Sequence, residues 1–198
     1  MFVQVIEGRV ADRDGLRRQM DGWMSDLRPG ATGFLGSTAG VTDDGHGITF
    51  ARFESAAAAK ANSERPEQGS WWADTEKCFD GEVTFRDSDD VETFLAGGSN
   101  DAGFVQIMKG SGADRDRLHA MDESFEQHAA SFRPDLMGGF RVWTGPDTYV
   151  EVAYFTSEAE ARAGETKEPP AELADQMGEF QDLMANIEFL DLREPWLY

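Results

Sequence analysis

The sequence predicts an α+β protein made of two tandem copies of one β-α-β-β-α-β unit. Residues 2–16 return as residues 104–118, shifted by 104 − 2 = 102 positions, with 9 of the 15 residues identical. The same shift recurs far downstream, in the pairs Ala51/Ala153, Phe53/Phe155 and Ser55/Ser157. A constant offset held across so much of the chain indicates an internal duplication. The periodicity of apolar residues then gives both copies the same order of strands and helices.

The duplication predicts two domains, 1–87 and 102–198, joined by a linker over 88–101. The linker range is rich in Asp, Ser and Gly, although Val91 and Phe94 suggest a short helical turn within it. Each copy would have roughly 95 residues, a size at which a single core is marginal. We therefore expect the two copies to bury apolar surface against each other.

The elements of the first copy follow from its apolar spacing and its turn residues. Residues 2–7 carry apolar side chains on both faces, as a central strand does. Asp12 or Asp14 begins a helix, and Pro29 stops it because proline cannot continue a helix. The expected order is strand 2–7, a helix to Leu27, strands 33–40 and 47–53, a helix from Ser55 interrupted near Pro66 and ended by Gly81, and strand 82–86.

The second copy repeats this order. Pro134 ends its first helix as Pro29 does in the first copy, and Gly145-Pro146-Asp147 forms the turn of a hairpin. Pro169-Pro170 interrupts its second helix. The expected elements are strand 103–109, helix 114–131, strands 138–144 and 148–155, a split helix at 157–164 and 171–184, and strand 186–192.

The duplicated unit, with an alanine-rich helix after the strand end Phe53-Glu-Ser55, resembles the dimeric α/β-barrel superfamily, which has a ferredoxin-like fold. That superfamily includes antibiotic-biosynthesis-type monooxygenases and haem-degrading monooxygenases. Its members pack two four-stranded sheets face to face. The resemblance implies two tandem ferredoxin-like domains whose antiparallel sheets form an intramolecular α/β barrel. The physics agrees, because a sheet with helices on one face needs a partner for its other face.

The resemblance also implies a ligand pocket at Asn62, Trp71 and Trp72 of the first copy. The cofactor-independent oxygenases of this superfamily place an Asn and a Trp around an aromatic substrate, in a dry pocket. Asn62 corresponds to Gly164, and no paired tryptophans follow Gly164, so this interpretation assigns the pocket to the first copy. The alternative is structural: one tryptophan belongs to the core and the other to the barrel interface.

Gln4 and Arg52 are further pocket candidates. Gln4 and its counterpart Gln106 are polar residues in otherwise apolar strands, so each either lines a pocket or satisfies neighbouring polar groups. Arg52, whose counterpart is Tyr154, could hold an anionic or phenolic ligand, or pair with one of the many carboxylates.

The sequence predicts neither a metal site nor a cofactor. His46, His119 and His128 are scattered, and no His-x3-His or Cys-x2-Cys spacing occurs. No phosphate loop or dinucleotide fingerprint is present either. The haem-degrading branch of the superfamily that the chain resembles has a ligand histidine after the tryptophan, where this sequence has Lys77-Cys78.

Composition narrows the class of partner. A formal net charge of −20 repels phosphate backbones, so we expect no nucleic acid partner. No apolar run has the length of a membrane helix, and residues from Phe2 onward have the pattern of a strand rather than of a signal peptide. The single cysteine, Cys78, suits a reducing cytoplasm. We expect a cytoplasmic monomer or homodimer.

Two functional hypotheses remain open at this point. The first is binding of a small aromatic molecule, or cofactor-independent monooxygenase-like activity, in the first domain. The second is a non-catalytic pseudodimer that serves as a structural or partner-binding module. A pocket of several hundred Å³ would favour the first hypothesis over the second.

Overall fold

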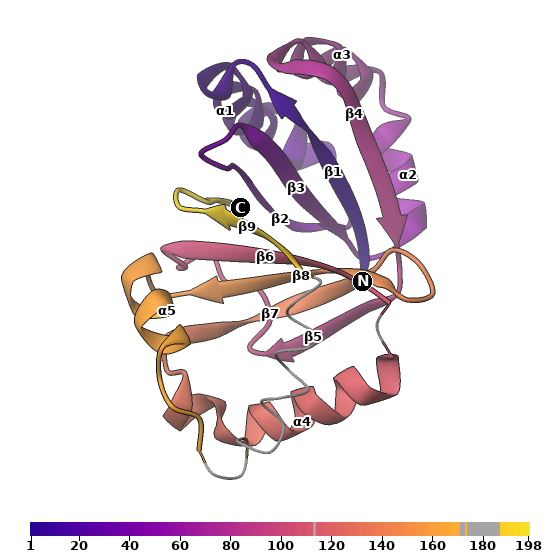
Figure 1. Cartoon of the computed structure of the whole chain (residues 1–198). Coiled ribbons are helices and arrows are strands. Elements are labelled where there is room, and N and C mark those ends of the chain that lie inside the picture. Colours follow the sequence, from indigo (N-terminus) through magenta and orange to yellow (C-terminus); the bar gives the residue numbers. More distant parts are fainter. Residues whose placement is uncertain (113, 171–172, 174–186) are drawn as a thin grey trace. The chain divides into compact units, whose positions relative to one another are not determined.

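The computed structural model describes residues 1–198 except 113, 171–172 and 174–186, and it divides the chain into two compact domains (Figure 1). The first domain comprises Met1–Val91 and Glu194–Tyr198, and the second comprises Glu92–Arg193. We predicted a linker over 88–101, but the structure places a strand, β5 (Val91–Leu95), within this range. The chain therefore passes between the domains twice, once near Val91 and once near Glu194.

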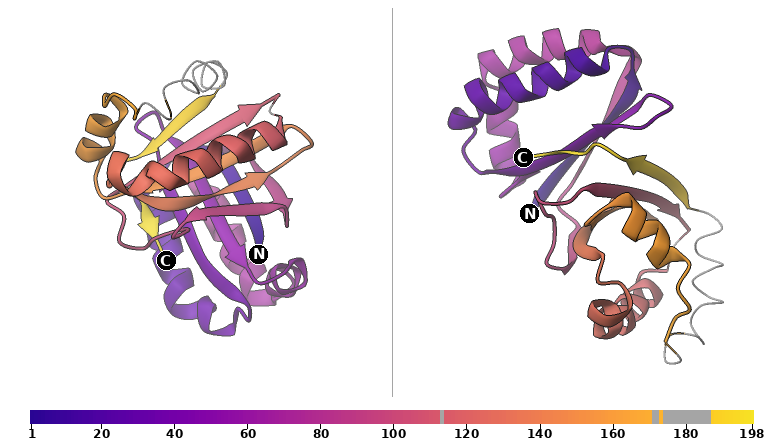
Figure 2. Two further views of the ribbon diagram at one scale, coloured as in Figure 1. Left: turned by 90° about the horizontal axis from the view of Figure 1, so that it is seen from below. Right: turned by 90° about the vertical axis from the view of Figure 1, so that its left-hand side faces the viewer.

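The first domain has one five-stranded antiparallel sheet in the order β10-β2-β3-β1-β4. Three helices lie on one side of this sheet (Figure 2). The bounds are β1 (Phe2–Val10), α1 (Arg13–Gly22), β2 (Phe34–Val41), β3 (His46–Phe53), α2 (Ala56–Ser63), α3 (Pro66–Thr75), β4 (Phe79–Ser88) and β10 (Trp196–Leu197).

The helix ends of the first domain largely follow local sequence. The Asp12 carboxylate caps α1 by accepting from the Gly15 backbone N–H at 2.8 Å, and Ser55 caps α2 in the same way. Pro66 occupies the first turn of α3, where its missing N–H costs nothing. The helix ends at Leu27 as predicted, but its last part is a π-helical turn (Trp23–Leu27) that follows directly on α1.

The last strand of the first repeat is longer than its apolar pattern indicates. Gly81 was expected to end a helix, but β4 already begins at Phe79 and Gly81 lies within it with φ +86°. Glycine adopts this backbone conformation without steric cost. The side chains of β4 are mostly exposed, so the alternation that identifies a half-buried strand is weak there.

The second domain repeats the arrangement, with a sheet in the order β5-β7-β8-β6-β9. Helices α4 and α5 lie on one side of this sheet (Figures 1 and 2). The predicted helix at 171–184 falls almost entirely outside the described residues. The bounds are β6 (Phe104–Ser111), α4 (Arg115–Phe132), β7 (Leu136–Trp143), β8 (Thr148–Phe155), α5 (Glu158–Glu165) and β9 (Glu188–Leu192).

Each sheet gains a fifth strand that follows the fourth strand of the other repeat. Strand β5 comes after β4 but pairs beside β7, and β10 comes after β9 but pairs with β2. The helical turn predicted around Phe94 is therefore a strand. The C-terminal tail covers an edge of the first sheet, because Trp196 and Leu197 pair with β2. Both sheets thus have five strands rather than the four of the predicted unit.

Part of the core of each domain lies between its sheet and its helices. In the first domain Phe2 and Phe53 pack against Ala59 of α2, and Leu16 of α1 packs with Val41 and Trp196. In the second domain Phe104 and Phe155 pack against Ala161 of α5. Among the described helices, including the 18-residue α4, none is both long and apolar enough to cross a membrane.

Candidate functional site

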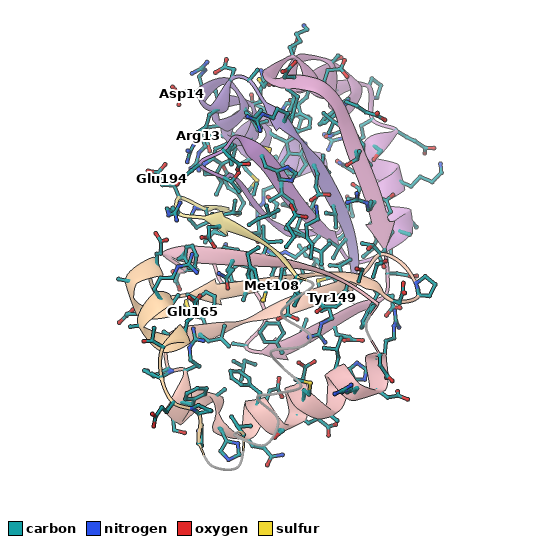
Figure 3. The ribbon with its side chains drawn as sticks, viewed as in Figure 1. Arg13, Asp14, Met108, Tyr149, Glu165 and Glu194 are labelled. Carbon is teal, nitrogen blue, oxygen red and sulfur yellow. The ribbon has the colours of Figure 1, made fainter. Side chains whose placement is uncertain are left out.

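A cavity of about 600 Å³ lies in the second domain, between its sheet and the helices α4 and α5. Its walls are mainly apolar and aromatic. Representative wall residues come from β5, β6, α4, β8 and β9: Phe94, Met108, Leu118, Phe125, Phe155 and Phe189. Figure 3 marks Met108 and Tyr149 on the sheet and Glu165 on α5. The volume is typical of a small-molecule site.

The alternation of β8 determines which of its side chains reach the cavity. Successive side chains of a strand point to opposite faces. Tyr149, Glu151, Ala153 and Phe155 all line the cavity, whereas Val150 and Val152 occupy the opposite face. A polar pair of positions, 149 and 151, is thereby placed beside an apolar pair, 153 and 155.

A buried guanidinium organises the polar part of the cavity. The Arg141 side chain is 5% exposed, and its Nε and Nη2 donate to Glu151 Oε2 at 2.9 and 2.6 Å. Its Nη1 and Nη2 donate to Asp122 Oδ2 and Oδ1 of α4 at 2.6 and 3.2 Å. Glu92 accepts a longer bond, 3.5 Å, from Nη1. The Arg141 guanidinium therefore donates hydrogen bonds to three carboxylates.

Neighbouring side chains fix this group in place. Trp143 Nε1 donates to Glu92 at 2.7 Å, and His119 Nε2 lies 2.9 Å from the same carboxylate. The Tyr149 ring lies 5.2 Å from the Arg141 guanidinium, a cation–π arrangement. Strands β5, β7 and β8 and helix α4 are thus joined by a single network.

Burial changes the acid–base properties of this network. Loss of hydration raises the pKa of Glu151, and the nearby Asp122 adds to this, while Arg141 acts in the opposite direction. Burial likewise raises the pKa of Tyr149 to about 12. Burial opposes the charge of Arg141, but the carboxylates of Glu151 and Asp122 raise its pKa overall. Glu151 is therefore a carboxyl group that binds a proton more readily than an exposed glutamate does.

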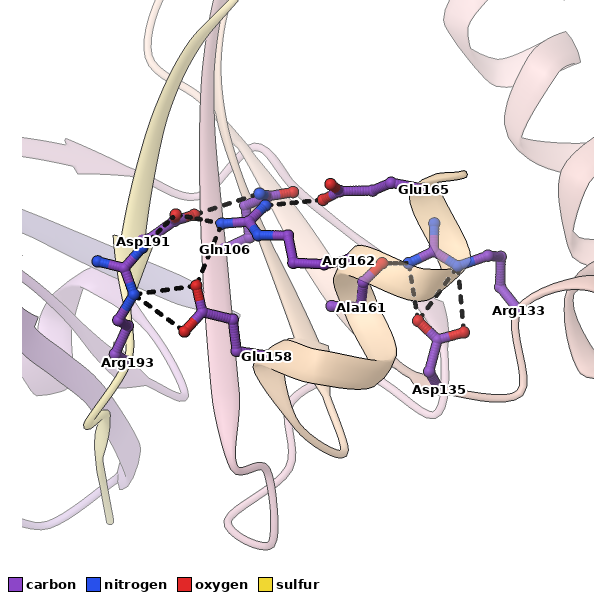
Figure 4. Close-up of polar contacts among 9 residues, drawn as sticks. All are labelled: Gln106, Arg133, Asp135, Glu158, Ala161, Arg162, Glu165, Asp191 and Arg193. Atoms are coloured by element: carbon purple, nitrogen blue, oxygen red, sulfur yellow. Dashed lines mark hydrogen bonds and ion pairs between the residues drawn. The ribbon is translucent and has the colours of Figure 1, made fainter. Parts of the chain in front are cut away.

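A second polar network anchors α5 to the sheet (Figure 4). Gln106 Nε2 donates to Asp191 Oδ1 at 3.2 Å, and Arg162 pairs with Asp191 Oδ2 and, at 2.8 Å, with Glu165. Arg133 forms a separate pair with Asp135 at 2.7 Å. The cations in Figure 4 are therefore paired with carboxylates of their own domain.

The structure places Asn62 and Trp71 in the first domain with their polar groups already bonded. Asn62 is buried, and its Oδ1 accepts from Arg65 Nη1 at 2.9 Å. Trp71 Nε1 donates to the Gln19 backbone oxygen at 2.9 Å. These bonds agree with the alternative in which the residues belong to the framework, and the ligand role of Asn62 and Trp71 stays a prediction.

The other predicted residues of the first domain do not form one group. The Trp72 ring contacts Phe85 edge to face at 5.0 Å. Gln4 Nε2 donates to Asp87 at 3.3 Å, the counterpart of the bond from Gln106 to Asp191. Arg52 lies on the face of β3 opposite to Phe53, which packs against α2. The sheet therefore separates Arg52 from the helix side, where the predicted Asn and Trp residues lie.

The Arg141 network belongs to one repeat alone. Subtracting 102 from 141, 149 and 151 gives Ala39, Gly47 and Thr49, none of which is charged. In the first domain an aromatic cluster packs on the helix side instead, with Trp23 touching Phe34 and Trp71.

We did not identify this network from the sequence. The available signal was Glu151 within an apolar alternating strand, together with Arg141 in the strand before it. Neither residue has a charged counterpart in the first repeat. In the described part of the chain no group of three or more His, Cys, Asp or Glu side chains is arranged to hold a metal ion.

The comparisons with known proteins concern the fold. Neither a protein-family model nor a curated protein sequence matches the chain. A crystal structure of a candidate monooxygenase from Lactobacillus acidophilus NCFM is similar, with a TM-score of 0.73 and 14% identity, covering 100% of this chain and 98% of that one. A second candidate monooxygenase, from Fusobacterium nucleatum, has a TM-score of 0.71 and 8% identity, covering 96% and 90%.

A third similar structure names the fold. It is an uncharacterised ferredoxin-fold protein from Listeria monocytogenes related to antibiotic-biosynthesis monooxygenases, with a TM-score of 0.50, 10% identity, and coverage of 96% and 92%. Identities this low establish shared architecture and leave activity open. The chain has the ferredoxin-like fold of proteins related to antibiotic-biosynthesis monooxygenases, as the sequence resemblance predicted.

Proposed function

We propose that the protein binds a small, largely apolar aromatic molecule in the cavity of the second domain. The observation that carries this proposal is the cavity itself, about 600 Å³ in volume, with aromatic walls and a polar network at one part of its lining. Small-molecule sites generally combine apolar walls with a few fixed polar groups that orient the ligand. The same observation counts against a purely structural module.

Monooxygenase-like activity is the finer form of this proposal. Two proteins of similar fold carry the name of monooxygenase candidates. In this chain the support is chemical: the raised pKa of Glu151 suits proton exchange with a ligand bound against the apolar walls of the cavity. A cofactor-independent oxygenation would need such a proton acceptor to form the substrate anion.

We infer in addition that the two sheets pack face to face within one chain, as the resemblance predicted. The support is that the face of each sheet opposite its described helices carries apolar side chains. These are Val3, Val5 and Phe50 in the first sheet and Val105, Ile107 and Val152 in the second. Native mass spectrometry tests the corollary, since an internal barrel should give a monomer of 21.9 kDa.

The binding proposal is tested with 1-naphthalenemethanol, a neutral aromatic probe, by isothermal titration calorimetry. Ala153 lines the cavity and is 3% exposed, so Ala153→Phe should fill the cavity and abolish binding. Ala51→Phe, at the equivalent position of the first domain, is the matched control and should leave binding intact. Circular dichroism establishes that both variants fold.

A third variant separates the two candidate sites. If the ligand instead binds at the predicted first-domain residues, Asn62→Ala should weaken binding and Ala153→Phe should not. That result would move the site to the first domain and overturn the present proposal. An absence of binding by the wild-type protein across a panel of neutral aromatic probes would overturn both versions.

A further inference from the structure

We propose that the second-domain cavity selects aromatic ligands that carry a protonated amine, and that Glu151 Oε1 accepts a hydrogen bond from that amine. This inference rests on the proposed function, because it specifies the class of ligand for the same cavity. It is carried by the charge balance of the Arg141 network and by how the carboxylate oxygens of that network are used.

The network has more negative than positive charge. Arg141 is the one guanidinium in contact with Glu151, Asp122 and Glu92. With all three carboxylates ionised, these four side chains carry a net charge of 1 − 3 = −2, and the network remains negative, at 2 − 3 = −1, when His119 beside Glu92 is protonated. In a poorly hydrated cavity, charges of like sign repel one another more strongly than in water. A ligand that brings a positive charge therefore relieves this repulsion, whereas an anionic ligand increases it.

The remaining charges around the cavity do not reverse this balance. The described lining includes five carboxylates, those of Asp122, Glu126, Glu151, Glu165 and Asp191, and four cations, Arg133, Arg141, Arg162 and Lys167. Arg162 and Arg133 are paired with Asp191 and Asp135. A ligand carboxylate at any of the three arginines would have to displace an existing carboxylate partner, with loss of that ion pair. Lys167 is an exposed side chain that donates to the Phe132 backbone oxygen at 3.3 Å.

The oxygens of the buried carboxylates are used unequally. Asp122 accepts from Arg141 through both of its oxygens, and Asp191 is bonded through both Oδ1 and Oδ2. Glu151 instead receives its two bonds from Arg141 on the single oxygen Oε2. Its Oε1 is the carboxylate oxygen that a ligand ammonium can engage while the bonds to Arg141 persist.

The surroundings of Glu151 suit an aromatic amine in particular. The aromatic ring of Tyr149 and the apolar side chains of Ala153 and Phe155 lie on the same face of β8 as Glu151. An ammonium group close to a tyrosine ring gains a cation–π attraction. The aromatic part of the ligand can then occupy the apolar part of the cavity, against Met108 and Phe125. Charge and shape together specify an arylalkylamine rather than an aryl acid.

The test compares three ligands with the same ring. These are 1-naphthalenemethylamine, 1-naphthalenemethanol and 1-naphthoic acid, titrated by calorimetry at one ionic strength. We expect the amine to bind about 10-fold or more tightly than the alcohol, as a hydrogen bond between charged groups predicts, and the acid to bind most weakly. Binding that persists in Ala153→Phe measures general attraction to the acidic protein surface and is subtracted.

Two variants test whether Glu151 is the residue responsible for the preference for the amine over the alcohol. Glu151→Gln should reduce the preference for the amine over the alcohol to less than about 3-fold, because it removes the charge from the accepting side chain. Glu165→Gln removes an equal charge from a cavity residue that is 41% exposed, and it should leave the preference unchanged.

The outcomes separate this inference from the proposed function. If the alcohol binds in a manner abolished by Ala153→Phe but the amine has no advantage, the cavity is a ligand site and the charge selection is wrong. Equal loss of amine preference in Glu151→Gln and Glu165→Gln would also overturn the assignment to Glu151. If none of the three probes binds, both the inference and the proposed function fail.

Discussion

Arg141 on β7 lies directly opposite Glu151 on β8, and its Nε and Nη2 donate to the same oxygen, Oε2, at 2.9 and 2.6 Å. This cross-strand pair sets the position of a largely buried carboxylate at the cavity. The Arg141 side chain is only 5% exposed and that of Glu151 is 16% exposed. Removal of either partner would leave a desolvated charge, and this determines how the site should respond to mutation and pH.

Arg141→Met should destabilise the second domain strongly. The substitution keeps much of the side-chain volume but leaves Glu151 and Asp122 without their cation. Breaking a buried ion pair in this way typically costs about 3–5 kcal/mol. Urea denaturation followed by circular dichroism measures the loss. Arg162→Met is the control, because the Arg162 side chain is 37% exposed and surface pairs contribute at most about 1 kcal/mol. Equal losses in the two variants would contradict the central role of Arg141.

Glu151 should make the stability depend on pH in a defined direction. Its pKa in the folded protein lies above the ordinary value of 4.5, chiefly because of burial. Over the interval above 4.5 the folded protein therefore holds a proton that the unfolded chain has released, and stability from this group falls as pH rises. Relative to wild type, Glu151→Gln should become progressively more stable as the pH rises above 4.5.

The measurement for Glu151 is the difference in unfolding free energy between wild type and variant at several pH values. Glu165→Gln removes a charge of the same sign from an exposed position and corrects for the change in net charge. A difference between wild type and Glu151→Gln that stays constant over the pH range, or that changes in the opposite direction, would show that burial does not dominate at Glu151.

Tyr149 should remain a neutral phenol well into the alkaline range. Burial raises its pKa to about 12 from an ordinary value of 10.0. The folded protein therefore retains this proton above pH 10, and stability falls as pH rises from 10 towards 12. Ultraviolet absorbance of tyrosinate during an alkaline titration, compared between wild type and Tyr149→Phe, measures the ionisation. Ionisation of this residue near pH 10 in the folded protein would contradict its burial.

Tryptophan fluorescence should report ligand binding through Trp143. Four of the five tryptophans, Trp23, Trp71, Trp72 and Trp196, belong to the first domain, and Trp143 is the one in the second. Trp143 bonds to Glu92 in the Arg141 network. Quenching by a neutral aromatic ligand should therefore disappear in Trp143→Phe and persist in Trp71→Phe. The opposite pattern would favour the predicted site in the first domain.

Gly138 should not tolerate a side chain. It lies at the register shift of β7 with φ +145°, and an added Cβ would come within 2.7 Å of the Gly97 carbonyl oxygen. Gly138→Ala should therefore cost at least about 2 kcal/mol. Gly69 in α3 has open space around it, and Gly69→Ala should instead add about 0.5–1 kcal/mol. Thermal unfolding of the two variants makes the comparison, and a neutral Gly138→Ala would refute the close approach.

The sequence could predict the repeated unit because its signals are local and occur twice. Apolar alternation, capping residues such as Asp12, and helix-ending prolines act within a few residues of the elements they specify. The fifth strands lack such signals: β5 is short and mostly half-buried or exposed, and β10 has only two residues. Their pairing depends on which sheet edge is available in the folded chain, and local sequence does not specify that edge.

The site was harder to predict because it depends on differences between the repeats. The resemblance to cofactor-independent oxygenases implied a ligand role for Asn62 and Trp71, yet their polar groups are bonded within the first domain. Arg141 and Glu151 are ten positions apart and become neighbours only through hairpin register. A comparison of the two copies position by position identifies them as charges present in one repeat and absent from the other.

The two fifth strands have a consequence for how this protein can be divided. Each of them follows one repeat in the sequence but pairs with the sheet of the other repeat. Dividing the chain between the two repeats would therefore remove one edge strand from each sheet. A fragment ending at Val91 would lack β10 and expose the backbone of β2, an edge prone to association with other chains. Moving Glu194–Tyr198 to the front of Met1 would restore that edge in a single polypeptide, provided that a linker spans the three strand spacings between β10 and β1. The unit that is repeated in the sequence therefore differs from the compact unit of the structure.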